Sequence, residues 1–333
     1  MIKQEVISGG KFYLKKTGDF ILEYLVLLAI VILVVVTAIV EPRFLSTDNL
    51  LNLMRQFGPL SFVALGMTFI ILGGFIDLSV PGMISLVAMI TLGLVEAIGE
   101  IPAMIVGLAL GTTLGIINGT ILVTSGANTQ AKALFITFGM SQIYRSLALQ
   151  YTGGFPMNWG TLFDHPMPIT RALGTGTLGP ISYSFILFLV FLVVLHIVQT
   201  KTYFGRSVTY TGGNPIAAEL GGIPVKRVTI MIYALCGFMV AVGAIALFSR
   251  VSVTVPTVGN FFERDAIMAV VVGGTALSGG RGSVLRTVMG VSLVILMSNC
   301  LNLLDVPSHS QEVVRGAILV VAIWLDHRRH ARG

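Results

Sequence analysis

Charged residues are scarce in this sequence. Asp, Glu, Lys and Arg make up only 11% of the 333 residues, whereas 55% of the residues are hydrophobic. The 15 acidic and 21 basic residues are too few to cover so much apolar surface with a solvated shell. This composition argues against a soluble enzyme, a nucleic-acid-binding protein and a disordered chain. It predicts an all-α polytopic membrane protein.

The residues that most enzymes need are missing as well. The two cysteines, Cys236 and Cys300, lie inside apolar runs, and no Cys/His cluster has zinc-ligand spacing, so neither a disulfide nor a metal site is expected. The sequence has no phosphate-binding GxxxxGK[ST] loop, no GxSxG elbow and no HExxH motif. We therefore expect no catalytic residue and no cofactor in this chain. Active transport would need an ion gradient or a separate ATPase subunit.

Apolar runs long enough to cross about 30 Å of hydrocarbon recur along the whole chain. The first, Phe20–Val40, is too long for a signal-peptide core and has no cleavage site of small residues, so it is expected to be retained. With nine further runs, the pattern predicts about ten transmembrane helices, and Gly-rich breaks leave a count of eight to eleven open. The further runs lie near 58–75, 80–98, 101–124, 131–150, 181–199, 227–249, 263–279, 284–304 and 311–326.

The positions of the basic residues give an independent orientation. In the ten-helix arrangement with the N-terminal segment 1–19 inside, 14 of the 21 Lys and Arg residues fall on the cytoplasmic side. Short cytoplasmic loops are enriched in these residues. Both termini are therefore predicted to be cytoplasmic, flanking a transmembrane domain over 20–326. The basic tail 327–333 is interpreted as an anchor beside anionic lipid.

Two polar connections are long enough to have a role of their own: an outer loop over 151–180 and an inner loop over 200–227. The centre of the inner loop predicts a short helix. Asn214 can cap its start, Pro215 suits the first helical position, and Gly221-Gly222 stops it. Such a small-residue helix on the cytoplasmic surface suits the groove of a partner protein. An idle amphipathic connector is the alternative.

The two halves of the sequence share a Gly-interrupted pattern. Gly73-Gly74, Leu78-Ser79 and Gly82 are matched 199 or 200 positions later by Gly273-Gly274, Leu277-Ser278 and Gly282. Interrupted apolar segments at matching positions of two halves point to a transporter's substrate path, although glycine also serves close helix packing. The candidate path residues are Gly73, Gly74, Asp77, Ser79, Gly273, Gly274 and Ser278.

Ionisable residues within the apolar regions are few. Asp77 lies where two apolar segments meet, and two interpretations are open: its carboxylate binds a hydroxylated solute, or it caps the following helix. Arg145, Asp265, Glu312 and Arg315 lie towards the outer ends of predicted helices. Snorkelling to the interface or mutual pairing accounts for these four.

Several stretches resemble the membrane permeases of the ribose/xylose/galactose-type ABC importers. The inner-loop run from Gly212 to Val225 resembles that family's coupling segment, and the resemblance covers nearly the whole chain. The chain departs from the family pattern at Pro81, Ser146 and Arg281. The other similar stretches are Phe44–Asn49, Asn52–Gln56, Ala64–Thr68, Gly73–Val80, Ile267–Thr275 and Leu277–Gly282.

The resemblance implies the permease subunit of an ATP-driven monosaccharide importer in the bacterial cytoplasmic (inner) membrane. Two permease chains, identical or related, would form the path, and an extracytoplasmic solute-binding protein would deliver the solute. A cytoplasmic ATPase, which uses ATP and Mg, would dock on the inner loop. Alternatives are a permease for branched-chain amino acids or nucleosides, or a gradient-driven secondary carrier. The implied coupling residues are Gly205, Arg206, Gly213, Asn214, Ala217, Ala218, Glu219, Leu220 and Gly222.

Overall fold

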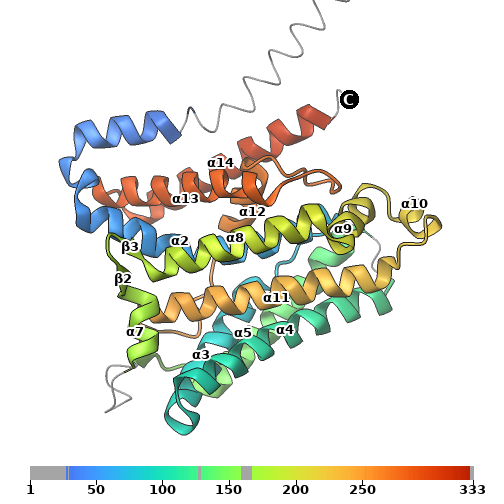
Figure 1. Ribbon diagram of the computed structural model, residues 1–333, viewed down its shortest axis with the longest axis horizontal. Helices are drawn as coiled ribbons and strands as arrows, with labels where there is room; N and C mark the ends of the chain where they lie inside the picture. The colour runs from blue at the N-terminus through green and yellow to red at the C-terminus, as the bar shows by residue number, and fades with distance from the viewer. Residues whose placement is uncertain (1–27, 29, 127–128, 159–166, 252, 331–333) are drawn as a thin grey trace, which may run out of the picture.

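The computed structural model describes residues 28, 30–126, 129–158, 167–251 and 253–330 (Figure 1). The predictions for segment 1–19, for the first part of Phe20–Val40, for 159–166 of the outer loop and for 331–333 of the tail lie outside these residues. The short elements are η1 (Pro42–Leu45), α7 (Pro168–Thr175), α9 (Tyr203–Gly213), α10 (Pro215–Leu220), α12 (Phe262–Val272), β1 (Met157–Asn158), β2 (Thr177–Leu178), β3 (Ile181–Ser182) and β4 (Val253–Thr254).

The described part of the chain is almost entirely helical. Six helices are long and apolar enough to cross a membrane, which confirms an all-α polytopic membrane protein. They are α2 (Thr47–Leu72), α3 (Val80–Ile98), α4 (Glu100–Thr124), α8 (Tyr183–Lys201), α11 (Val225–Arg250) and α13 (Val284–Leu303). The apolar helix Ile30–Val40 is shorter, and α5 (Gln130–Thr152) and α14 (Ser308–His330) are long but less apolar. The count of ten stays a prediction.

The helices run between two ends of the molecule (Figure 1). The hairpin β2–β3 and α7 lie at one end, and α9 and α10 lie at the other. At the first end β1 also pairs with β4, which joins residues far apart in the chain. The segments predicted to be outer thus lie at one end and those predicted to be inner at the other, while the orientation in the membrane stays a prediction. We call the two ends the outer end and the inner end.

Helices α2 and α11 form the centre of the fold, and both are largely buried along their length. Glycines, which have no side chain, allow these helices and α4 to approach one another closely. A Cβ atom on Gly66 of α2 would lie 3.1 Å from the Cα atom of Cys236 in α11. A Cβ atom on Gly237 of α11 would overlap the carbonyl oxygen of Gly111 in α4. Such small-residue contacts let membrane helices pack backbone against backbone.

One predicted transmembrane helix is wrong. The apolar run 263–279 does not form a continuous span, because α12 ends at Val272 after 11 residues. Eleven helical residues cover only about 17 Å, roughly half of the hydrocarbon thickness. The cause is Gly274, whose φ of +90° turns the chain out of the helix.

Two other boundaries also differ from prediction. Helix α2 begins at Thr47, well before the predicted 58–75, because the Ser46 side chain accepts a hydrogen bond from the Asn49 amide and caps it there. The inner loop 200–227 is mostly helical, since α9 precedes the predicted short helix. Hydropathy alone misses both features, because the added turns are polar or rich in glycine.

Candidate transport and coupling sites

The first Gly-Gly break ends α2 in a defined motif. The amide of Gly74 donates to the carbonyl of Ile71 at 2.9 Å, and the amide of Phe75 donates to the carbonyl of Ile70 at 3.0 Å. Gly74 has a φ of +85°, which residues other than glycine rarely adopt. These features define a Schellman motif, which satisfies the last carbonyls of a helix that stops inside the protein.

The second break, 200 positions later, ends α12 in the same way. The amide of Gly274 donates to the carbonyl of Val271 at 2.8 Å, and that of Thr275 donates to Val270 at 3.1 Å. The hydrogen-bond pattern and the left-handed glycine therefore match the first break residue for residue. The repeat inferred from the sequence is therefore matched in structure at the two Gly-Gly breaks. Beyond them it is not, because Gly82 lies within α3 whereas Gly282 precedes α13.

Polar side chains hold the irregular backbone that follows the second break. Gln130 donates to the carbonyl of Leu277 at 2.9 Å. Gln199 of α8 donates to the carbonyl of Gly282 at 3.0 Å and accepts from the amide of Val284 at 2.9 Å. Non-helical backbone at membrane depth requires such partners, because lipid offers none. The segment between α12 and α13 is therefore fixed on two sides.

The first break and the segment that follows the second break meet the end of α9 at the inner end of the molecule. The amide of Gly280 donates to the carbonyl of Leu72, the last residue of α2, at 2.8 Å. A Cβ atom on Gly212 of α9 would overlap that same carbonyl oxygen. Three chain segments thus approach one another at main-chain distance.

Neighbouring glycines complete this contact. A Cβ atom on Gly279 would lie 2.7 Å from the Cα atom of Gly74, and one on Gly280 would lie 2.6 Å from the Cα atom of Gly213. No larger side chain fits at either position without displacing backbone. We call this set the glycine junction: Gly74, Gly212, Gly213, Gly279 and Gly280.

The coupling segment suggested by the sequence is a pair of short helices beside the junction. Thr202 caps α9 by accepting from the amide of Gly205 at 3.1 Å. Asn214 caps α10 by accepting from the amide of Ala217 at 3.0 Å, and Gly222 has a φ of +84° beyond its end. The predicted helix with its cap and its stop is therefore present.

The coupling candidates differ in exposure. Gly205 and Ala218 are buried, and a Cβ atom on Gly205 would overlap carbonyl oxygens of α8. The exposed candidates are Arg206, Gly213, Asn214, Ala217, Glu219, Leu220 and Gly222. Leu220 is 86% exposed, and Ile216, one turn earlier, is 72% exposed. Helix α10 projects from the inner end with this apolar pair uncovered (Figure 1).

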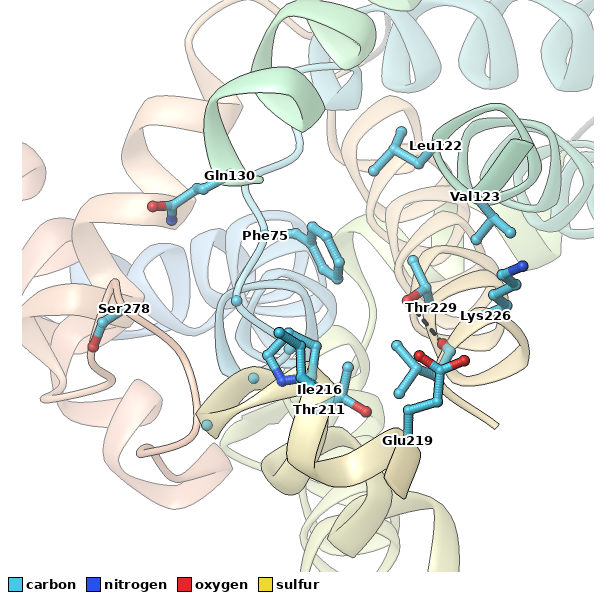
Figure 2. Close-up of a pocket in the computed structure, with 16 residues that line it drawn as sticks. Phe75, Leu122, Val123, Gln130, Thr211, Ile216, Glu219, Lys226, Thr229 and Ser278 are labelled. Atoms are coloured by element: carbon cyan, nitrogen blue, oxygen red, sulfur yellow. Dashed lines mark hydrogen bonds between the residues drawn. The ribbon is translucent and has the colours of Figure 1, made fainter. Parts of the chain in front are cut away.

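A cavity of about 560 Å³ opens between the first break, α4, α9, α10 and α11. Figure 2 shows Gln130 and Ser278 on one side of it and Leu122, Val123 and Lys226 on the other. Its full lining is Gly73, Gly74, Phe75, Leu122, Val123, Gln130, Thr211, Gly212, Gly213, Pro215, Ile216, Glu219, Val225, Lys226, Thr229 and Ser278.

The cavity brings together only part of the residues that the sequence singles out. Gly73, Gly74 and Ser278 from the two breaks meet Gly213 and Glu219 of the coupling segment there. The polar residues Gln130, Thr211, Lys226 and Thr229 were missed. Gln130 and Thr229 come from helix ends that no motif marks, whereas Thr211 and Lys226 belong to the inner loop already assigned to coupling.

Asp77 and Ser79 lie outside this cavity, in a buried polar network. Oδ1 of Asp77 accepts from the amide of Ser79 at 2.8 Å and from the Ser79 hydroxyl at 2.6 Å. Asn118 of α4 donates to the same hydroxyl at 2.7 Å and accepts from the hydroxyl of Tyr144 in α5 at 2.7 Å. The network ties α3, α4 and α5 together.

Gly273 and Gly274 also lie apart from the cavity. They pack against the start of α13, where a Cβ atom on Gly273 would lie 2.6 Å from the carbonyl oxygen of Arg286. Among the candidate path residues, these two are placed to serve close packing of α12 on α13.

Comparison with known proteins identifies the family. The sequence profile described as "Branched-chain amino acid transport system / permease component" matches residues 49–323. The chain belongs to this permease family. The matched region includes both breaks, the glycine junction and the coupling segment, which are the features that the resemblance drew on.

Individual relatives match this chain over almost their full length. The chain is 39% identical to the ribose import permease protein RbsC of Bacillus subtilis, with 96% of this chain and 94% of the relative covered. It is 35% identical to RbsC of Haemophilus influenzae, over 93% and 94%. It is 30% identical to the xylose transport system permease protein XylH of Escherichia coli, over 98% and 96%.

These findings confirm the family resemblance seen in the sequence. The chain is a multi-pass membrane protein of the permease type, similar throughout to permeases named for sugars. No solved structure matches it.

Proposed function

We propose that this chain is the membrane subunit of an ATP-binding-cassette importer and forms the path for a monosaccharide. The relatives named above carry the names of ribose and xylose permeases, which favours a pentose-sized solute. The chain would lie in the bacterial cytoplasmic membrane with about ten transmembrane helices and both termini inside. ATP and Mg would be used by a partner ATPase.

The exposed apolar pair on α10 is the observation that carries this proposal. A two-turn helix with Ile216 and Leu220 uncovered would be poorly placed in water unless a partner covers it. Its ends are fixed by Asn214 and Gly222, so it can enter a groove without first becoming ordered. The cytoplasmic ATPase is the partner that fits this position.

The glycine junction supports a mechanical link from α10 to the path. Movement of α10 carries α9, because only Asn214 separates the two helices. The end of α9 approaches the first break and the Gly279-Gly280 segment through main-chain atoms, so a shift there acts on the end of α2 and on the segment between α12 and α13. Coupling of this kind needs no ionisable group in the path.

The remaining partners follow from the two ends of the molecule. The outer end would receive the extracytoplasmic solute-binding protein, and a second permease chain, identical or related, would complete the path. The description of the family as a branched-chain amino acid transport system keeps an amino-acid solute as the second candidate.

The proposal is tested in vesicles that contain this chain, its ATPase and its solute-binding protein. Uptake of labelled ribose or xylose should require ATP and all three proteins. Leu220→Ser, alone and combined with Ile216→Ser, should lower co-purification of the ATPase and uptake by about tenfold or more, while the melting temperature stays unchanged.

Leu178→Ser is the matched control, because Leu178 is 63% exposed at the outer end. It should leave ATPase association unchanged. Uptake that persists without the ATPase and follows an ion gradient would reject the importer. ATP-dependent uptake of leucine but of no sugar would favour the second candidate.

A further inference from the structure

Helix α5 exposes a polar stripe beside apolar residues such as Ile143 and Leu149. It packs on α3 and α4 through a buried side made of Ala133, Thr137, Ser141, Tyr144 and Ala148. The opposite side exposes Gln142, Ser146 and Gln150, which follow one another at intervals of four residues and so lie along one stripe. We call this the α5 stripe.

The stripe runs through the middle and the second half of α5. Gln142 is 12 residues from the start of α5 and 10 from its end, so it is about 18 Å and 15 Å from the two ends of the helix. Within the described part of the chain, the side chains of Gln142, Ser146 and Gln150 make no hydrogen bond to another residue. An amide left without partners in hydrocarbon costs roughly 2–7 kcal/mol.

Other exposed helix faces are different. Helix α8 exposes Leu189, Val190, Val193, Val194 and Ile197. On α4, the exposed hydroxyls of Thr113 and Thr124 donate to backbone carbonyls one turn earlier, at 2.8 Å each. Hydroxyls bonded in this way can meet lipid, and among the described residues Thr120 is the exposed hydroxyl of α4 that has no such bond. The unpaired amides on α5 therefore distinguish its face from those of α4 and α8.

We propose that the α5 stripe forms one wall of the water-filled translocation path, faces the same stripe of a second copy of this chain, and hydrogen-bonds the hydroxyl groups of the solute. This assignment rests on the proposed function and names the helix and the side chains that line the path. A glutamine amide both donates and accepts, as the hydroxyls of a sugar do.

Neighbouring residues on α5 agree with a sugar as the occupant. Phe135 and Phe138 are 74% and 52% exposed on the same side, and aromatic rings can cover the C–H surface of a sugar. The only charged residues of α5 are Lys132 and Arg145, which disfavours a cationic solute.

The test is the accessibility of single cysteines in nanodiscs, where both faces of the membrane meet water. Gln142→Cys and Ser146→Cys are placed in a chain with Cys236→Ala and Cys300→Ala, and Val190→Cys and Val193→Cys on α8 are the matched controls. The probe is the membrane-impermeant anion sulfonatoethyl methanethiosulfonate. Both α5 cysteines should react at least about tenfold faster than the α8 cysteines.

Two results would overturn the assignment. Equal, slow reaction on α5 and α8 would mean that lipid covers both faces. Slow reaction of Gln142→Cys together with direct disulfide formation between two copies would mean a dry interface. The labelling uses neither ATP nor solute, so its failure leaves the importer itself standing.

Transport supplies the second measurement. Gln142→Leu should raise the KM for sugar uptake by about fivefold or more with normal yield, because one hydrogen-bonding group is lost from the path. Val193→Ala should leave the KM unchanged. An unchanged KM for Gln142→Leu would remove this residue from solute contact.

Discussion

The side-chain amides of Asn49 and Asn299 hydrogen-bond each other in both directions. Asn49 donates to Asn299 at 3.1 Å, Asn299 donates back at 2.8 Å, and both side chains are buried between α2 and α13. Asn49 also donates to the carbonyl of Phe44 at 2.8 Å. This pair joins the first half of the chain to the second near the outer end.

Removing one partner of this pair should cost more than removing both. Asn299→Leu leaves the side-chain oxygen Oδ1 of Asn49 buried without a hydrogen-bond donor. We expect the free energy of unfolding to fall by about 1–3 kcal/mol. In the double variant Asn49→Leu/Asn299→Leu, part of this loss should return. Unfolding in detergent, followed by the melting temperature, gives the comparison. A strictly additive double variant would contradict the coupling of the two amides.

Two adjacent glycines of α9 should respond differently to alanine. Gly212→Ala places a Cβ atom against the carbonyl oxygen of Leu72, so both folded yield and uptake should fall. In Gly213→Ala the nearest atom would be 4.0 Å away, which is ordinary contact. That variant should be neutral or gain up to about 1 kcal/mol from helix propensity. Equal effects of the two substitutions would mean that Gly212 has room for a Cβ atom, which contradicts the close approach of Gly212 to Leu72.

Alanines 217 and 218 give a similar contrast within α10. Ala218 is only 5% exposed, so Ala218→Arg should destabilise α10 by about 2–4 kcal/mol and lower uptake while membrane insertion persists. Ala217 is exposed, and Ala217→Arg should leave the melting temperature unchanged. Proteolysis at the inner end checks the local order of α10. Normal solute-stimulated ATP hydrolysis with Ala218→Arg would make α10 an idle connector.

Asp77 should tolerate asparagine. The Oδ1 atom that accepts from Ser79 is kept in Asp77→Asn, so uptake per folded molecule should stay within about twofold of the wild type. Asp77→Leu removes the acceptor of two buried hydrogen bonds and should cost about 1–3 kcal/mol of stability, seen as lower yield and melting temperature. A large loss of uptake in a well-folded Asp77→Asn chain would instead restore Asp77 as a path residue.

Single cysteines test the orientation. Thr175, in α7, and Thr209, in α9, lie at opposite ends of the molecule. In a chain without Cys236 and Cys300, an impermeant maleimide added to intact cells should label Thr175→Cys and leave Thr209→Cys unlabelled. Labelling of both from outside would reject the arrangement with cytoplasmic termini.

The features that could be predicted from the sequence are those set by residues close together in the chain. Helix α10, its Asn214 cap and its glycine stop were all predicted, because these signals act within a few residues. The pairing of Asp265 and Arg315, 2.9 Å apart, was one of the two alternatives given. Arg264, which pairs with Asp265 and Glu312, was missed, because which charged residues meet depends on how α12 packs on α14.

Long-range contacts set the limit of such predictions. Nothing in the run around Gly280 shows that it meets α2 and α9, since that meeting depends on how the helices pack. The partners of Asp77 in the polar network come from α4 and α5 for the same reason. Hydropathy also gave one span over 263–279, because an average over many residues cannot register a turn made by one glycine.

Main-chain atoms supply the hydrogen bond between Gly280 and Leu72 and the close approaches at the glycine junction. The contacts within the glycine junction therefore do not depend on which side chains surround the path. If α5 lines the path as proposed, substitutions along it should change which solute is accepted and leave the main-chain contacts at the helix ends unaltered. Solute selectivity and energy coupling would then depend on different residues, and relatives that transport different solutes could share the same coupling contacts.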